Sequence, residues 1–229
     1  ATRVIEETER SAPFLPVTVK DQLSFDEIAR IAANTPTLAG VTVEQGLSRV
    51  YPSLESYAHV VGYVGPVSDN DLKQSNDSNP LLKIPRFQVG KVGVEKHYED
   101  VLRGSAGIMK VEVNALGRVM RNLDRKEGKP GNNIQLTVDT DLQTYIQARL
   151  GSESASAVVM NCKNGEILAI ASSPSYDPNK FVKGISYSDF NELRDNKFRP
   201  LASKTVQDAY PPGSTFKIVT ALAALEAKI

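Results

Sequence analysis

Ser214 and Lys217 have the residue types and the spacing of a nucleophile and its base. Ser214 follows the turn sequence Pro211-Pro212-Gly213, and the apolar residues after it are spaced for one face of a helix. A serine at the start of that helix lies beside unpaired backbone N–H groups and the positive end of the helix dipole. Both favour attack on a carbonyl group, because negative charge develops where the donors point. Lys217 lies one helical turn further on, where a neutral amine could accept the serine proton.

The same two residues also have a purely structural interpretation. Ser214 could be only the N-cap of the helix, and Lys217 a solvated helix residue. The pattern Ser-x-x-Lys occurs once in the chain, and both residue types are common in proteins. The tetrapeptide alone therefore leaves catalysis and capping open, and the rest of the sequence has to be considered with it.

Composition excludes several classes of protein. The chain has 229 residues, with 27 basic and 27 acidic side chains and no net charge. This balance argues against nucleic acid as a main partner, because no basic excess neutralises phosphates. The longest apolar run, at 218–225, is too short to span a bilayer. The single cysteine, Cys162, forms no internal disulfide, and His59 and His97 lack partners at metal-ligand spacing. We expect no metal and no cofactor.

Helix and strand patterns alternate in the first half of the chain. Ser24 and Glu27 form a capping box for a helix that reaches about Asn34. A segment at 58–65 predicts a buried strand or a short helix ending at glycines, and the turn-rich stretch 66–85 predicts a loop. Alternating apolar residues predict strands at 16–20, 40–44, 47–51 and 110–114.

The segment Gly90–Gly104 is predicted to be helical. Val94, Tyr98 and Leu102 share one helical face and are expected to be buried, and Gly104 is a plausible C-cap. Its Gly-x-x-Gly sequence lacks the Gly-Lys-Ser/Thr ending of a phosphate-binding loop. These glycines are therefore interpreted as structural.

A polar stretch at 126–133, rich in glycine, proline and asparagine, predicts a domain boundary. After it we expect a strand at 134–138, a helix capped by Asp139 or Asp141 that reaches about Leu150, and a hairpin around Asn164-Gly165. The mixture of elements indicates an α+β fold. The predicted domains are 1–125, a linker with the start of the next domain at 126–154, and 155–229.

The chain resembles the class B penicillin-binding proteins, and most closely their cell-elongation subgroup, penicillin-binding protein 2. Four ordered segments carry the resemblance, and they are more specific together than a single motif. They are 49–52 with 59–64, 90–104, 155–179 and 210–217.

The resemblance implies an elongated N-terminal pedestal, also called the dimerisation domain, followed by a transpeptidase domain. It implies an enzyme that cross-links peptidoglycan: a serine attacks a D-alanyl-D-alanine stem peptide and passes the acyl group to an amine on a neighbouring strand. β-Lactams acylate the same serine. By position, Ser214 is then the nucleophile and Lys217 the general base.

The resemblance also implies a place and partners. Such enzymes face the periplasm from the bacterial inner membrane, held by one N-terminal anchor that we expect to be absent from this sequence. Their pedestal contacts a rod-shape glycosyltransferase and a scaffold protein.

The sequence departs from the family pattern in places. No Ser-x-Asn or Lys-Thr-Gly motif stands at a fitting position after Ser214, so we expect this piece to be inactive by itself. Ser203-Lys204-Thr205 stands where many relatives carry Asn-Arg-Ala.

Two alternative functions share parts of this evidence. A serine β-lactamase or β-lactam sensor would have the same serine and lysine, but would lack the pedestal segments. A non-catalytic pedestal fragment would act as a protein-interaction module. Acylation by a labelled penicillin distinguishes an enzyme from such a module.

Overall fold

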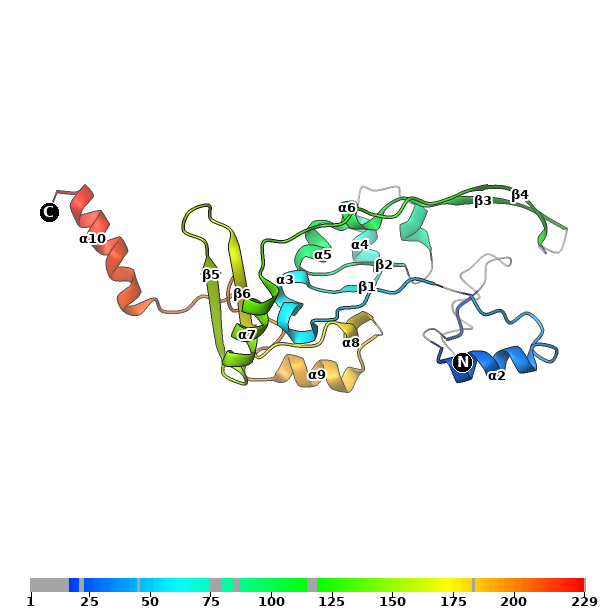
Figure 1. Ribbon diagram of the computed structural model, residues 1–229, viewed down its shortest axis with the longest axis horizontal. Coiled ribbons are helices and arrows are strands. Elements are labelled where there is room, and N and C mark those ends of the chain that lie inside the picture. Colours follow the sequence, from blue (N-terminus) through cyan, green and yellow to red (C-terminus); the bar gives the residue numbers. More distant parts are fainter. Residues whose placement is uncertain are drawn as a thin grey trace. The chain divides into compact units, whose positions relative to one another are not determined.

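The computed structural model describes residues 17–20, 23–44, 46–74, 80–84, 87–114, 119–182 and 184–228 (Figure 1). The chain divides into two compact units. Unit 1 comprises Ala1–Val50, Val64–Lys91 and Glu95–Ile134, and unit 2 comprises Tyr51–Tyr63, Val92–Val94 and Gln135–Ile229. The change from Ile134 to Gln135 follows the polar stretch 126–133, but unit 2 also takes two earlier segments. The domain limits 1–125, 126–154 and 155–229 stay a prediction.

The described part of unit 1 contains short helices and two antiparallel strand pairs. Strand β1 pairs with β2, and β3 pairs with β4 in a long two-stranded ribbon that contains two register shifts (Figure 1). The elements are α2 (Phe25–Asn34), β1 (Val64–Pro66), α4 (Asp69–Gln74), η2 (Pro80–Lys83), β2 (Gln88–Gly90), α6 (Glu99–Arg103), β3 (Ile108–Val113) and β4 (Val119–Lys126). Helix α5 (Gly93–His97) has residues of both units.

Helix α2 confirms its predicted capping box. The Ser24 hydroxyl accepts from the Glu27 N–H at 3.3 Å, and the Glu27 carboxylate accepts from the Ser24 N–H at 2.9 Å. The strands predicted at 16–20, 40–44 and 47–51 are wrong for their described residues, which form no strand. A segment of alternating apolar and polar residues forms a strand only when a second strand pairs with its backbone N–H and C=O groups. These segments have no such partner strand among the described residues. The strand predicted at 110–114 is confirmed by β3, whereas the turn expected at 115–118 lies outside the described residues.

The prediction of one buried helical face over 90–104 is wrong. Tyr98 has a φ of −109° and a ψ of 24°, which divides the segment into α5 and α6. Tyr98 is 42% exposed, and Val94 and Leu102 are only half-buried. The buried side chain is Glu95, whose carboxylate pairs with the Arg49 guanidinium at 2.9 Å.

Two predictions about the glycines of this region are confirmed. Gly104 ends α6 with a φ of +74°, as expected of a C-cap. Gly62 has a φ of +80°, and a Cβ at this position would lie 2.0 Å from the Val92 carbonyl oxygen. Gly93 completes this backbone-to-backbone contact, since its own Cβ would lie 2.8 Å from the Gly62 nitrogen. These glycines are structural, as the sequence indicated.

Gly62→Ala should therefore lower the free energy of unfolding of unit 2 by about 2–4 kcal/mol, because backbone strain and an overlap with Val92 add. Gly165→Ala is the matched control, since Gly165 has a similar φ of +79° but open space around it. That control should lose about 1 kcal/mol in a urea denaturation experiment. Equal losses for both variants would contradict the close contact.

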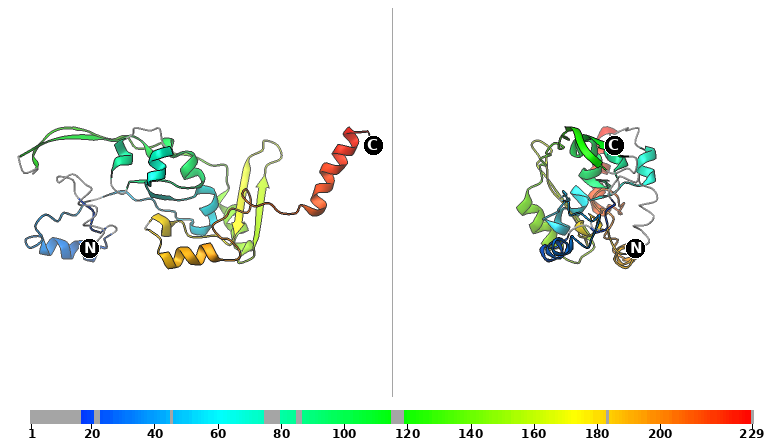
Figure 2. Two further views of the ribbon diagram at one scale, coloured as in Figure 1. Left: turned by 180° about the vertical axis from the view of Figure 1, so that it is seen from behind. Right: turned by 90° about the vertical axis from the view of Figure 1, so that its right-hand side faces the viewer.

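Unit 2 contains the predicted hairpin with a helix against it. Strands β5 and β6 are antiparallel, and α7 lies along them, as Figures 1 and 2 show from opposite sides. Asp139 caps α7 by accepting from the Leu142 N–H at 2.8 Å. The elements are η1 (Leu54–Tyr57), α3 (Ala58–Val61), α7 (Thr140–Leu150), β5 (Ala155–Met160), β6 (Ile167–Ser173), α8 (Asn179–Val182), α9 (Tyr187–Asp195), η3 (Gly213–Phe216) and α10 (Lys217–Glu226). The strand predicted at 134–138 is wrong, because this segment forms no ladder.

Gln143 joins α7 to β6. Its side-chain nitrogen donates to the carbonyls of Ser56 at 2.7 Å and Ile170 at 3.0 Å, and its oxygen accepts from the Ile170 N–H at 2.8 Å. The side chain is fully buried. One amide therefore pairs both backbone groups of Ile170, in the way a neighbouring strand would.

An aromatic cluster forms the core of unit 2. Tyr63 stacks on Phe181 with ring centroids 4.1 Å apart, and Tyr176 forms an edge-to-face pair with each of these two rings. Ala58 lies buried in the same cluster, and residues of α9 pack around it. This core holds the segment 174–182, which precedes the chain leading to Ser214.

Candidate active site

The serine elbow, the segment 210–217 around Ser214, has the predicted local structure. Gly213 has a φ of +55°, a backbone conformation that a side chain would strain, so a glycine before the serine is required. The chain then enters η3 and continues without a break into α10. Ser214 lies in the first turn of this helical segment, which confirms its predicted place at a helix N-terminus.

Lys217 lies one turn from Ser214. Its backbone N–H donates to the Ser214 carbonyl oxygen, which fixes the spacing of the two residues. Both are exposed, and within the described part of the chain the Ser214 hydroxyl makes no hydrogen bond. A lysine accepts a proton only where burial and neighbouring charges favour its neutral amine. The structure therefore gives the spacing of a nucleophile and a base, but not a desolvated site.

Helix α10 is apolar and has no buried residue. Its large side chains Ile218, Leu222 and Leu225 are all more than 60% exposed. A globular protein normally packs such a stripe against other elements.

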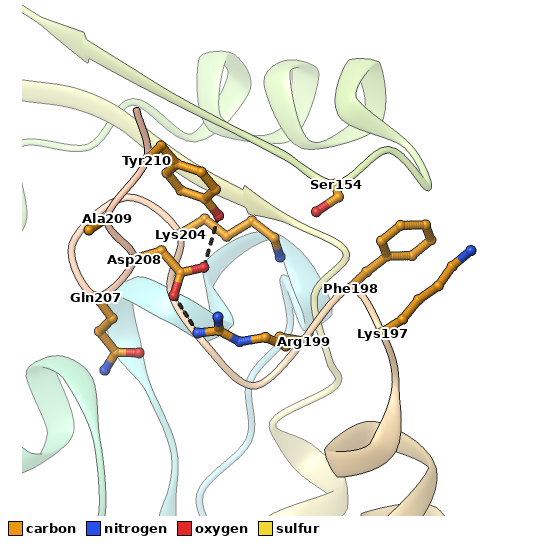
Figure 3. A pocket seen from close by; sticks show the side chains of 9 residues that line it. All are labelled: Ser154, Lys197, Phe198, Arg199, Lys204, Gln207, Asp208, Ala209 and Tyr210. Atoms are coloured by element: carbon orange, nitrogen blue, oxygen red, sulfur yellow. Dashed lines mark hydrogen bonds and ion pairs between the residues drawn. The ribbon is translucent and has the colours of Figure 1, made fainter. Parts of the chain in front are cut away.

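A hollow of about 460 Å³ lies in unit 2, lined by the chain just before the elbow (Figure 3). Asp208 is its central acceptor: the Arg199 guanidinium pairs with one carboxylate oxygen, and the Tyr210 hydroxyl donates to the other at 2.8 Å. The hydrogen bond from Tyr210, with smaller contributions from Arg199 and Lys204, lowers the pKa of Asp208. The first residue of the elbow, Tyr210, therefore lines the hollow and is held there by its hydrogen bond to Asp208.

Lys204 is the residue that sequence analysis missed. It is 5% exposed, its backbone N–H donates to the Ser172 hydroxyl at 3.1 Å, and its amine makes no hydrogen bond among the described residues. Burial lowers its pKa. The sequence marked this position only as a departure from Asn-Arg-Ala, and nothing in its pattern predicted that a lysine would be buried.

The described residues hold no group of three or more His, Cys, Asp or Glu side chains that could bind a metal. Cys162 is exposed near the hairpin turn. His59 meets the Tyr176 ring edge-on, and its Nε2 atom is buried without a hydrogen bond. None of the helices in the described ranges has the length and apolar character needed to cross a membrane.

The pKa of His59 predicts an acid sensitivity. Burial, and secondarily the charge of Lys204, lower this pKa from 6.5 to about 4. Below pH 6.5 the unfolded chain binds a proton that the folded chain does not, so stability should fall as the pH drops from about 6.5 to 4, by at most about 1.4 kcal/mol per pH unit. His59→Gln should flatten this part of the profile in urea denaturation at several pH values. If the stability of His59→Gln falls with pH as steeply as that of the wild type, a lowered pKa of His59 is not the cause of the acid sensitivity.

Comparison with known proteins shows the family. Residues 2–136 match the penicillin-binding protein dimerisation domain, and residues 155–229 match the penicillin-binding protein transpeptidase domain. The chain belongs to the penicillin-binding proteins.

The relatives lie in the subgroup that the sequence segments indicated. The peptidoglycan D,D-transpeptidase MrdA of Escherichia coli K12 is 40% identical over 98% of this chain, and MrdA of Salmonella typhimurium LT2 is 42% identical over 94%. Penicillin-binding protein 2 of Helicobacter pylori, solved in a complex with MreC, has a TM-score of 0.78 and 31% identity over 92% of this chain and 39% of its own.

Penicillin-binding protein 2 of Pseudomonas aeruginosa, solved in complex with WCK 5153, has a TM-score of 0.66 and 36% identity over 81% of this chain and 37% of its own. This penicillin-binding protein sequence spans 36% of the length of the E. coli relative. The resemblance to class B penicillin-binding proteins of the elongation subgroup and the α+β pedestal-plus-transpeptidase fold are both confirmed.

Proposed function

We propose that this chain is part of a peptidoglycan D,D-transpeptidase of cell elongation, with Ser214 as nucleophile and Lys217 as general base. The observation that carries the proposal is the serine at a helix start, one turn before a lysine, inside the segment that matches the transpeptidase domain. The curated relatives are named as D,D-transpeptidases.

The reaction has two steps. The Ser214 oxygen attacks the carbonyl carbon between the two terminal D-alanines, and its proton passes to the Lys217 amine. Backbone N–H groups at the start of η3 stabilise the oxyanion, and the tetrahedral intermediate collapses with loss of D-alanine, which takes up a proton. The amine of a neighbouring stem peptide then attacks the acyl-serine, forms the cross-link and releases Ser214.

The proposed domains are a pedestal at 1–125, a linker and domain start at 126–154, and part of the transpeptidase domain at 155–229. We place the whole protein at the periplasmic face of the inner membrane. The match over 2–136 favours this function over a β-lactamase or β-lactam sensor, which has no such pedestal.

A second function for the pedestal is binding to a scaffold protein and a rod-shape glycosyltransferase. The solved complex of Helicobacter pylori penicillin-binding protein 2 with MreC supports the scaffold partner. In this chain the β3–β4 ribbon leaves Met109, Met120 and Leu123 exposed, each by more than half. A pull-down of MreC by the 229-residue chain tests this function separately from catalysis.

The enzymatic function is tested with a protein that carries the whole transpeptidase domain. It is incubated with a stem peptide ending in D-alanyl-D-alanine and an amine acceptor. Released D-alanine and the cross-linked product are measured by mass spectrometry. Ser214→Ala should abolish both products, and Ser203→Ala, a change in a buried hydroxyl ahead of the elbow, should retain them. Full activity of the Ser214→Ala protein would overturn the proposal.

A further inference from the structure

The hollow before the serine elbow contains a buried amine without a hydrogen-bond partner among the described residues. Three of its lining side chains are cationic (Lys197, Arg199 and Lys204), and one is anionic (Asp208). Asp208 already pairs with Arg199 and accepts from Tyr210. Lys204 therefore has no hydrogen-bonded counter-charge among the described residues, although it is the most buried of the three cations.

Burying the Lys204 amine without a bound partner costs free energy. A buried ammonium group loses its hydration, and only a partner that accepts its hydrogen bonds returns that free energy. The Lys204 backbone is held where it stands, because its N–H donates to the Ser172 hydroxyl at 3.1 Å. The buried side chain lines a space of about 460 Å³ that has room for an acceptor.

We infer that this hollow binds a small carboxylate, held by the Lys204 amine. Figure 3 shows the Lys204 side chain extending into the hollow towards Ser154, with the Phe198 ring beyond it. Lys204 is the one buried cation of the hollow without a hydrogen-bond partner among the described residues, because Lys197 is exposed and its amine lies 4.6 Å from the Phe198 ring centroid. A single buried positive charge matches a monoanion better than a doubly charged phosphate. Ser154 offers a hydroxyl donor at the rim, and the half-exposed Phe198 ring offers a flat apolar surface for the body of the ligand.

The carboxylate can come from two sources with the same chemistry: a free small acid, or an acidic side chain of the same protein in a segment outside this sequence. The inference does not use Ser214 or Lys217. A protein without transpeptidase activity could therefore still bind the carboxylate, and a protein that does not bind the carboxylate could still be a transpeptidase.

Benzoate is the probe, because it joins a carboxylate to a flat ring, and benzamide is the neutral control of the same shape. Titration calorimetry of the 229-residue chain should show one saturable benzoate site and no benzamide site. Lys204→Met should weaken benzoate at least about tenfold, since a charge-assisted hydrogen bond is lost. Lys163→Met, at an exposed lysine of the hairpin turn, should bind within about twofold of the wild type.

A wild-type measurement covers the case in which Lys204→Met does not fold. Acetic anhydride modifies lysine amines, and benzoate should slow the acetylation of Lys204 several-fold while leaving Lys163 unchanged. The benzoate titration is then repeated on a longer protein that contains this sequence and is as long as its relatives. This second titration distinguishes a free small acid from an acidic side chain of the same protein. Benzoate binding there indicates a free ligand. Loss of binding, with Lys204 protected from acetylation in the absence of benzoate, indicates a side chain of the protein itself.

Three results would overturn the inference: no saturable benzoate binding by the 229-residue chain, equal binding by Lys204→Met, or tighter binding of inorganic phosphate than of benzoate at Lys204.

Discussion

Lys217→Met, in a protein that carries the whole transpeptidase domain, should slow acylation of Ser214 by about 10²–10⁴-fold, the usual contribution of a general base. The two residues are one helical turn apart, with the Lys217 N–H bonded to the Ser214 carbonyl oxygen. Methionine keeps the length and helix propensity of lysine but cannot accept the proton. The protein is mixed with a fluorescent penicillin, samples are denatured at successive times, and the fluorescence bound to the protein gives the acylation rate.

Lys228→Met is the matched control, because Lys228 lies just past the end of α10 and is exposed. Its acylation rate should stay within about twofold of the wild type. A Lys217→Met rate that also stays within twofold would remove lysine from the mechanism and leave Ser214 to another base.

Gln143→Leu should lower the free energy of unfolding of unit 2 by about 3–6 kcal/mol. The substitution keeps the volume of the side chain but leaves three part-buried backbone groups without partners: the N–H and carbonyl of Ile170 and the carbonyl of Ser56. Each should cost about 1–2 kcal/mol, the lower part of the usual range, because none of the three hydrogen bonds is fully buried. Urea denaturation followed by circular dichroism measures the loss.

Gln147→Leu, one turn further along α7, provides the comparison. Gln147 makes a single, longer hydrogen bond to the Ser172 carbonyl, at 3.3 Å, and should cost only about 1 kcal/mol. If the two variants lose the same stability, the amide of Gln143 does not replace a strand at the edge of β6.

Local signals in the sequence predicted the parts of the fold that local interactions determine. The capping box at Ser24 and Glu27 and the hairpin turn at Asn164-Gly165 depend on residues only a few positions apart, and both are found as predicted. Segments that need a distant partner were predicted poorly. The alternation in 40–44 and 47–51 resembles a strand, but no second strand pairs with the described residues there.

The helical periodicity of 90–104 was also misleading. Three apolar residues share a face only if the helix is continuous, and the backbone of Tyr98 interrupts it. The buried residue is instead the charged Glu95, which Arg49 compensates from 46 positions earlier. A hydrophobic pattern does not reveal such a pairing.

The candidate site shows the same division. The position of Ser214 at a helix start follows from the Pro-Pro-Gly turn and the apolar spacing after it, which are local features. The burial of Lys204 depends on tertiary packing, and composition places a lysine at the surface by default. The family resemblance supplied the chemistry that neither pattern determines.

The mass of the protein after incubation with a fluorescent penicillin tests whether Ser214 is the nucleophile. A protein with the whole transpeptidase domain should gain one penicilloyl group, and peptide mapping should place it on Ser214. The 229-residue chain should gain none, because Ser214 and Lys217 both lie in water on a helix with no buried residue. An adduct on the Ser214→Ala protein, or a stoichiometric adduct on the 229-residue chain, would contradict the account.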